Sequence, residues 1–377
     1  MNLVYNFIAV LLFFFAEYAV RAVIPLFITD YLDFSRTYSG YFMGIFSIGG
    51  MVAKFITGAI ADRFGKLRVY GIYLILSSIV VYFYGFFVSI YILMIVRLMH
   101  GFCSGAVRTI YQPVTVSLAK QQHLSRAIGI TGTGAMAAMV VVAPIAVMFV
   151  DIWSYRIFFT TAAILCLSAF LMVLPIKLKE PAPVRTGGLG TFIEISSVLP
   201  FAMLRFVHSA AHGIFMAYGI IFAKEVSLIN SGLFLTAFAL GNATFRSLTG
   251  FVMDRIKKWY IIMIVAYLMI IVGYTIFSFQ FFILGAFLVG AGSGIDYTAI
   301  NSEVFNNIGD RSMNRISATM ETVVSVGAGA GAVLSGLTYT GPLNWMFLFI
   351  GGLYIVQIGL LFAYARWKER HSTVVSQ

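Results

Sequence analysis

The chain has 377 residues, of which 60% are hydrophobic and 10% are charged, and its mean hydropathy is +0.95. This composition excludes a soluble globular domain, and apolar runs of about 20 residues have the length of membrane-spanning helices rather than of barrel strands. The net charge of +11 fits basic loops that orient a membrane protein, so the lipid bilayer is an expected partner and nucleic acid is not. The sequence therefore predicts an all-α integral membrane protein.

Twelve hydrophobic stretches follow one another along the chain, and we expect each to form one transmembrane helix. They cover residues 5–28, 38–61, 69–88, 91–118, 127–150, 155–176, 198–222, 230–253, 259–279, 281–303, 315–338 and 343–365. Residues 177–197 form the longest polar segment, which includes the glycine-rich sequence TGGLG. We therefore predict an N-terminal six-helix bundle at 1–176, a cytoplasmic linker at 177–197 and a C-terminal six-helix bundle with a short tail at 198–377.

The basic residues of the loops are divided unevenly between the two sides of the membrane. If both chain ends are cytoplasmic, 16 of the 25 Lys and Arg residues lie in inner loops and the tail, and 3 lie in outer loops. Basic loops are typical of the cytoplasmic side. This predicts a protein of the cytoplasmic membrane with both termini inside, and its short loops fit a prokaryotic inner membrane.

A charged motif occurs twice, at the ends of the second and the eighth predicted helices. The matching residues, at a constant offset of 192, are Lys54 and Arg246, Gly58 and Gly250, Asp62 and Asp254, and Arg63 and Arg255. The constant offset indicates two homologous halves. We expect Gly58 and Gly250 to permit close approach of a neighbouring helix, and Lys54 and Arg246 to extend towards the membrane surface.

The fourth and tenth predicted helices share a second pattern, at an offset of 189. It places glycines four residues apart at Gly101 and Gly105 and again at Gly290 and Gly294. Small residues at this spacing let helix backbones approach closely. We therefore interpret them as packing positions.

The first copy of the charged motif, GAIADRFGKLR, resembles the loop between the second and third helices of major facilitator superfamily transporters. The resemblance implies twelve helices in two parallel-related bundles, transport by alternating access, and a monomer. It also implies a cytoplasmic gate that holds helix ends together in the outward-open state. The residues of this gate motif are Gly58, Asp62, Arg63, Gly65, Lys66 and Arg68 in the first copy, and Gly250, Asp254 and Arg255 in the second.

The fifth predicted helix departs from one pattern of the superfamily. Many of its antiporters carry Gly-Pro-x-x-Gly-Gly there, whereas residues 143–148 of this chain read APIAVM. The double glycine is missing, so the usual mark of drug export is weak and the direction of transport stays open.

Ionisable side chains within the helices of the first half are the first candidates for a substrate or proton site, because each costs about 2.5–3.5 kcal/mol to insert. Glu17 and Arg21 are four residues apart, share a helix face and can pair. Arg97 and Arg108 lie about three turns apart on one face. Arg97 must find a partner on another helix or bind an anion. Arg97 also opens a segment that resembles the Arg-x-x-x-Gly pattern of proton-coupled members.

The second half offers a different set of candidates. His208 and His212 share a face, with Arg205 one turn earlier. The histidines could relay protons, form packing hydrogen bonds or, with a third ligand, bind metal. Asp296 lies well inside the tenth helix, and Glu321 lies early in the eleventh. We expect the faces that bear Glu17, Arg97, Arg108, His208 and Asp296 to line one internal cavity.

These observations favour a secondary active transporter of a small molecule, not an enzyme, with proton coupling through Glu17, Asp296 or Glu321. No Walker-type phosphate loop is present, so no cofactor is expected and a proton gradient is the predicted energy source. Six cations against four acids within the helices favour an anionic, zwitterionic or acidic amphipathic substrate. The alternatives are a multidrug/proton antiporter and, in another class, a membrane enzyme or receptor with a metal site at His208 and His212.

Overall fold

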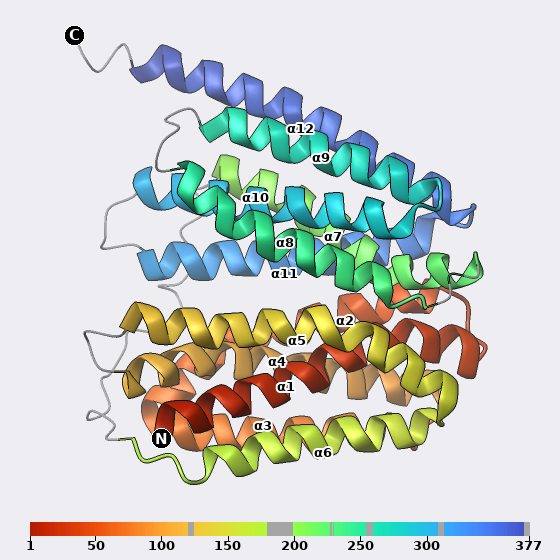
Figure 1. Cartoon of the computed structure of the whole chain (residues 1–377), viewed down its shortest axis with the longest axis vertical. Helices are drawn as coiled ribbons and strands as arrows, with labels where there is room; N and C mark the ends of the chain where they lie inside the picture. Colours follow the sequence, from red (N-terminus) through yellow and green to blue (C-terminus); the bar gives the residue numbers. More distant parts are fainter. Residues whose placement is uncertain are drawn as a thin grey trace.

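The computed structural model describes residues 1–119, 124–178, 199–226, 228, 230–253, 259–307 and 313–372, and in these residues the regular structure is helical (Figure 1). The helices are α1 (Asn2–Leu26), continued by the π-helical turn η1 (Phe27–Tyr31), α2 (Thr37–Phe64), α3 (Lys66–Phe83), α4 (Ile90–Leu118), α5 (Leu124–Ile152), α6 (Tyr155–Val173), α7 (Leu199–Glu225), α8 (Leu233–Met253), α9 (Trp259–Ser278), α10 (Phe282–Asn307), α11 (Met313–Thr338) and α12 (Leu343–Ser372).

Each predicted transmembrane stretch corresponds to one of these helices, which confirms the fold class. Among the described residues, ten helices are long and apolar enough to cross a membrane. The third helix was predicted at residues 69–88 but lies closer to the N-terminus. It begins at Lys66, within the charged motif, and ends at Phe83, where a turn follows. Most of the predicted linker, residues 179–197, lies outside the described residues.

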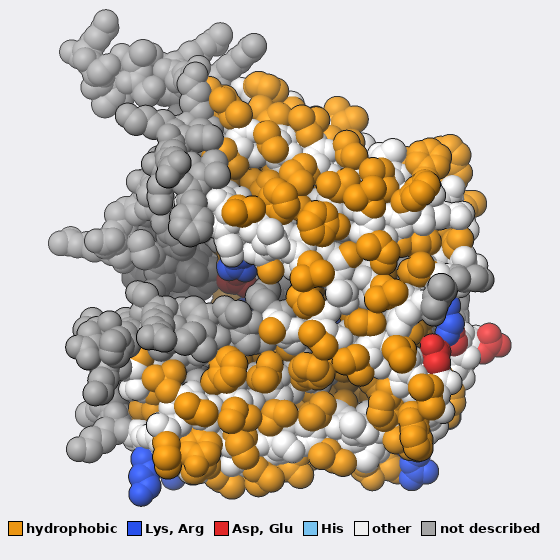
Figure 2. All heavy atoms as spheres, viewed as in Figure 1, with side chains coloured by type: hydrophobic (Ala, Val, Ile, Leu, Met, Phe, Trp, Pro, Cys, Tyr) orange, Lys and Arg blue, Asp and Glu red, His pale blue; other side chains and the backbone are white. Residues whose placement is uncertain are grey.

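The helices form two bundles that lie one above the other in Figure 1, α1–α6 below and α7–α12 above. One hydrophobic cluster contains residues between 9 and 173 alone, and the other consists mainly of residues between 201 and 361. Hydrophobic side chains cover much of the lateral surface in Figure 2, as expected of a surface that faces lipid.

The glycine pattern of the fourth and tenth helices is confirmed as packing. A Cβ at Gly101 would collide with the α2 backbone at Phe46, and one at Gly290 would collide with the α8 backbone at Phe238. Gly105 and Gly294 are in similar close contact one turn further on. The contacts of α4 with α2 are thus repeated by α10 with α8, as two homologous halves require.

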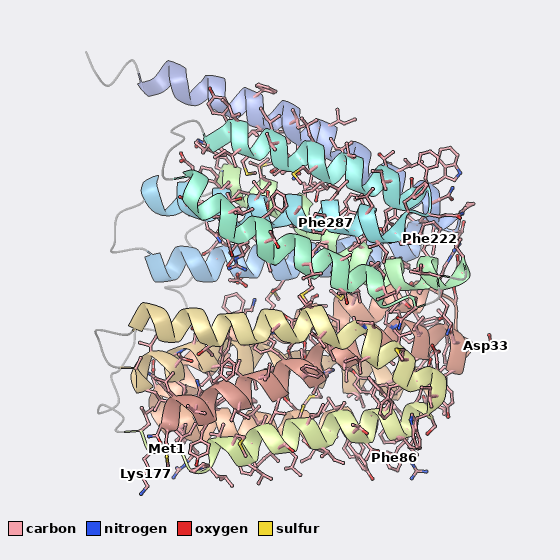
Figure 3. The ribbon with its side chains drawn as sticks, in the orientation of Figure 1. Met1, Asp33, Phe86, Lys177, Phe222 and Phe287 are labelled. Carbon is pink, nitrogen blue, oxygen red and sulfur yellow. The ribbon has the colours of Figure 1, made fainter. Side chains whose placement is uncertain are left out.

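The two ends of the bundles can be told apart by the chain itself. The beginning of α1 and the end of α12 lie on one side in Figure 1, which we name the terminal side, and Figure 3 places Met1 and Lys177 there. Asp33, Phe86 and Phe222 lie at the opposite end, the distal side (Figure 3). Under the orientation predicted above, the terminal side would face the cytoplasm.

The distal halves of the bundles are packed tightly against each other. Gly40 and Gly44 of α2 lie directly against the α11 residues Ala332 and Val333. Between α5 and α8, Pro144 cannot donate the helical hydrogen bond that the Val140 carbonyl would otherwise accept. Thr236 of α8 donates to that carbonyl instead, over 2.7 Å.

The terminal halves are arranged differently. Apart from the nearby backbone of its own helix, no described heavy atom lies within 4 Å of the position that a Cβ would take at Gly58 or Gly250. Among the described residues no neighbouring helix reaches these two glycines, and the close approach expected of them in the outward-open latch stays a prediction. Figure 2 shows a hollow between the bundles towards the terminal side, with basic and acidic side chains inside it.

Candidate functional site

Glu17 is the centre of a charged cluster in the first bundle. Its carboxylate lies 3.0 Å from Nη2 of Arg21 and 3.6 Å from Nη2 of Arg108, and only 1% of its side chain is exposed. The other carboxylate oxygen lies 3.2 Å from Nε2 of His100. The predicted pair of Glu17 and Arg21 is thus confirmed, and α4 adds two more partners from across the bundle.

His100 connects Glu17 to Arg97. Nη1 of Arg97 lies 3.3 Å from Nδ1 of His100, and a guanidinium can only donate. Nδ1 must therefore accept, which assigns the imidazole hydrogen to Nε2, the nitrogen that faces Glu17. His100 was not among the site residues predicted from the sequence. A polar ring within an apolar helix, three residues after Arg97, was the signal that could have revealed it.

Arg97 finds its partners inside the bundle. Its Nε donates to the carbonyl of Phe42 over 3.2 Å, and its guanidinium carbon lies 4.3 Å from the centre of the Phe46 ring. Only 2% of the residue is exposed. Arg97 is therefore a buried member of the cluster rather than a residue that contacts a bound molecule directly.

The cluster carries more positive than negative charge. The guanidiniums of Arg21, Arg97 and Arg108 are accompanied by one carboxylate, so with neutral His100 a surplus of two positive charges remains. The side chains of Arg21 and Arg108 are 22% and 29% exposed. Their Nε atoms are buried and lack a hydrogen-bond acceptor among the described residues, so each guanidinium keeps a donor that its present partners do not use.

The second bundle holds a separate cluster around Asp296, which is fully buried. Arg205 of α7 donates to Asp296 of α10 over 2.9 Å. Nδ1 of His208 lies 3.8 Å from the same carboxylate oxygen and 3.0 Å from the hydroxyl of Tyr354 in α12. Because one acid here meets one guanidinium, this cluster is close to neutral.

The two clusters use equivalent helices with the charges exchanged. In the first bundle the acid lies on α1 and its basic partners include Arg108 on α4. In the second bundle the base Arg205 lies on α7 and the acid Asp296 on α10. Equivalent helices therefore carry opposite charges but at different positions, because the offsets of 191 and 189 relate Glu17 to His208 and Arg108 to Tyr297.

The expectation that five charged residues line one cavity is wrong. Arg97, His208 and Asp296 are buried within their own bundles, with 2%, 8% and 0% exposed. Each has at least one partner on another helix of its own bundle, Phe42 for Arg97, Tyr354 for His208 and Arg205 for Asp296. The groups that approach the interface between bundles are instead Arg21, Arg108 and a third, Glu321.

Glu321 of α11 meets Lys54 of α2 across the interface. Nζ of Lys54 lies 3.3 Å from Oε2 of Glu321 and 3.1 Å from Oγ of Ser325. Lys54 therefore does not extend to the membrane surface as expected, because a partner in the other bundle is closer. The Glu321 side chain is 47% exposed, and Arg108 lies near enough for its charge to act on it.

His208 and His212 do not act as a pair. His208 contacts Tyr354 and Asp296, whereas the ring of His212 lies 5.3 Å from that of Phe238. Among the described residues, no group of three His, Cys, Asp or Glu side chains is placed to hold a metal ion.

The gate motif is described in its first copy. Gly65 ends α2 with a positive φ of 94°, a conformation that other residues adopt only with strain. Its N–H donates to the Ala61 carbonyl over 2.9 Å, and the Arg63 guanidinium lies 5.3 Å from the Phe64 ring centre. Asp254 and Arg255 lie outside the described residues, so the latch itself stays a prediction.

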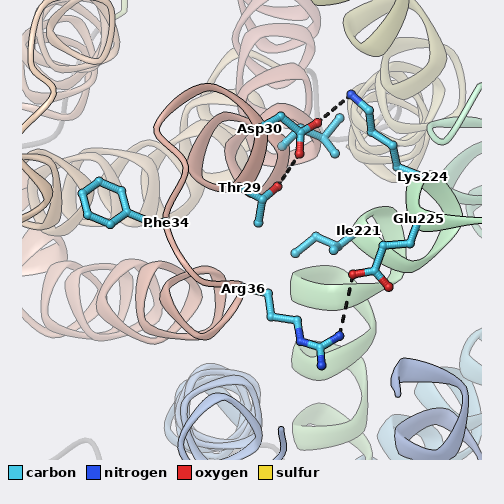
Figure 4. Close-up of a pocket in the computed structure, with 8 residues that line it drawn as sticks. Thr29, Asp30, Phe34, Arg36, Ile221, Lys224 and Glu225 are labelled. Atoms are coloured by element: carbon cyan, nitrogen blue, oxygen red, sulfur yellow. Dashed lines mark hydrogen bonds and ion pairs between the residues drawn. The ribbon is translucent and has the colours of Figure 1, made fainter. Parts of the chain in front are cut away.

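Charged residues also join the two bundles at the distal side, around a cavity of about 400 Å³ (Figure 4). Lys224 of α7 lies 2.6 Å from Asp30 at the end of α1, and Glu225 lies 3.7 Å from Arg36 before α2. Arg36 also donates to the carbonyl of Gly341 over 2.7 Å. We name these four charged residues the distal lock; none of them was predicted from the sequence as a site residue.

Comparison with known proteins agrees with this architecture. The profile of the Major Facilitator Superfamily matches residues 7–205 and 198–376, one match for each half. The chain belongs to the major facilitator superfamily.

Solved structures with the same fold include a mutant of the nucleoside transporter NupG, with a TM-score of 0.80 and 15% identity over 97% of this chain and 99% of that one. The human organic anion transporter MFSD10 (TETRAN) has a TM-score of 0.67 and 14% identity over 95% and 98%. A bacterial homolog of the human lysosomal transporter Spinster, in an inward-facing and occupied conformation, has a TM-score of 0.76 and 14% identity over 97% and 96%. The superfamily and these neighbours indicate a transporter rather than an enzyme.

Proposed function

We propose that this chain is a proton-coupled transporter that moves a small organic anion by alternating access between its two bundles. The observation that carries the proposal is the cluster of Glu17, in which one buried carboxylate is shared by Arg21 and Arg108 and both guanidiniums are partly exposed. The organic anion transporter among the structural neighbours supports the same substrate class.

Coupling follows from competition for the same two guanidiniums. A substrate anion that binds Arg21 and Arg108 draws them away from Glu17, which is then a buried charge without its counter-ions. A carboxylate in that position takes up a proton, because the neutral form avoids the cost of burying the charge. Release of the substrate restores the ion pairs and releases the proton.

The packing supports a conformation that is closed at the distal side. The bundles meet there through Gly40, Gly44 and the distal lock, whereas at the other end no other helix of the described part of the chain lies close to Gly58 or Gly250. The bound anion would therefore exchange with the terminal side in this state. In the outward-open state the gate motif would close that side.

Proton flux in proteoliposomes tests the proposal. Vesicles loaded with a pH-sensitive dye are given a panel of organic acids, and wild type is compared with Glu17→Gln and Arg108→Gln. We expect an acid-dependent proton signal that Glu17→Gln abolishes and Arg108→Gln strongly weakens. Acid uptake without proton movement in wild type, or a proton signal unchanged in both variants, contradicts the proposal.

A multidrug/proton antiporter is the competing function, and hydrophobic cations in the same assay test it. The surplus of positive charge around Glu17 opposes binding of a cation.

We also propose a monomer in the cytoplasmic membrane with both termini inside. Thiol labelling of single cysteines at Ser35 and Lys177 in intact cells tests the orientation.

A further inference from the structure

Arg246 of α8 is a cation with an aromatic partner and, among the described residues, no ion-paired acid. Its guanidinium carbon lies 3.9 Å from the centre of the Tyr297 ring of α10. Among the described residues, no carboxylate oxygen lies within 4 Å of its nitrogens, and the residue is only partly buried. The sequence analysis expected this side chain to extend to the membrane surface, but it stacks on Tyr297 instead.

The internal repeat makes this lack of an acid informative. Lys54 is the equivalent of Arg246 in the first half, and Glu321 on the facing helix α11 neutralises it. Across the interface between the bundles, α8 faces α5, and residues 124–150 of α5 include no Asp or Glu. Within the described residues, the second half has thus kept the cation without an ion-paired acid, a costly arrangement within a membrane unless an anion is bound there.

Tyr297 places this cation next to the interface between bundles. Its ring lies between two guanidiniums, because Arg205 is 4.5 Å from its centre. Asp296 already neutralises Arg205, so of these two guanidiniums Arg246 is the one available to bind an anion. Tyr297 also lies close enough to Tyr111 of α4, in the first bundle, for the two side chains to interact electrostatically.

We infer that Arg246, held on the ring of Tyr297, is a second anion-binding contact, and that the substrate carries two acidic groups. Arg21 and Arg108 would bind one group and Arg246 the other, so that the substrate bridges the two bundles. The inference rests on the proposed function and adds the number of acidic groups to it. A bridging dianion binds best when the bundles close around it, which links recognition to the change of state.

Binding of matched ligands to the purified full-length protein tests the inference. The probes are short linear dicarboxylates, from succinate to suberate, each with its monomethyl ester, and the readout is intrinsic tryptophan fluorescence with a thermal-melting check. We expect the best diacid to bind wild type about tenfold or more tightly than its ester. In Arg246→Gln the diacid and the ester should bind equally, both with the affinity of the ester.

Arg156→Gln is the matched control, since Arg156 stacks on Phe86 at 4.5 Å on the distal side and should leave the diacid preference intact. If Arg246→Gln does not fold, Arg246→Lys replaces it and should retain a reduced preference, because an ammonium keeps the charge without the planar stacking. The inference is wrong if no diacid binds better than its ester, or if Arg246→Gln weakens both equally. The proposed function still stands in either case, provided that a monoacid is transported with protons and Arg108→Gln blocks it.

Discussion

The distal lock gives the most direct test of how the two bundles alternate. Replacement of Arg36 by Ala removes its ion pair with Glu225 and its hydrogen bonds to the carbonyls of Thr340 and Gly341. Replacement of Lys224 by Ala removes only the contact with Asp30. Both changes should favour the state in which the distal side is open, and Arg36→Ala should do so more strongly.

The size of each effect follows from exposure. The Lys224 and Asp30 side chains are 43% and 34% exposed, so their pair is worth about 0.2–1 kcal/mol and its loss increases the distal-open population about 1.4- to 5-fold. Arg36→Ala also removes charge-assisted hydrogen bonds. Because these contacts are partly exposed, the ion pair and the hydrogen bonds together contribute about 1–2 kcal/mol. That corresponds to about a 5- to 30-fold increase.

Pulsed electron resonance between nitroxide labels at Ser35 and Phe281 measures the population, since both positions are exposed on the distal side. We expect a second, longer distance that grows from wild type to Lys224→Ala to Arg36→Ala. High salt should produce the same change in wild type. The exchange of both charges, Asp30→Lys with Lys224→Asp, should restore the wild-type distribution. If the double variant behaves like the sum of its singles, or if Arg36→Ala leaves the distances unchanged, the lock does not control the state.

Three further predictions concern stability and use thermal melting of purified protein. Glu17→Gln leaves Arg21 and Arg108 without their carboxylate and should lower the free energy of unfolding by about 3–5 kcal/mol. Glu225→Gln, at an exposed position, should lower it little. Equal melting temperatures of the two variants would contradict the stabilising role of Glu17 in its cluster. Gly65→Ala forces a side chain into a positive φ and should lower the free energy of unfolding by about 1–2 kcal/mol. Gly58→Ala meets open space and should not destabilise the protein. If Gly58→Ala lowered the melting temperature more than Gly65→Ala, Gly65 would not be a required turn residue. Thr236→Val leaves the Val140 carbonyl without a donor and should lower the free energy of unfolding by about 1 kcal/mol. Thr160→Val should cost less, because the hydroxyl of Thr160 bonds only within its own helix. Similar losses in the two variants would contradict the role given to Pro144.

The sequence by itself determined the features that depend on local spacing. The length of apolar runs predicted the helices, and the constant offset of Asp62 and Asp254 predicted the two halves. The pair of Glu17 and Arg21 was also predictable, because residues four apart in a helix lie on one face. Each of these depends only on the geometry of a single helix or on a repeat along the chain.

Tertiary structure alone decided which charges meet across helices. Arg205 and Asp296 are 91 residues apart, and Lys54 and Glu321 are 267 apart. Helix rotation and packing brought His100 to the cluster of Glu17, and among the described residues they left Arg246 without an ion-paired acid. In a membrane an embedded charge takes the nearest available partner, because no water competes for it. That partner is set by the distance between helices, which spacing along the chain does not contain.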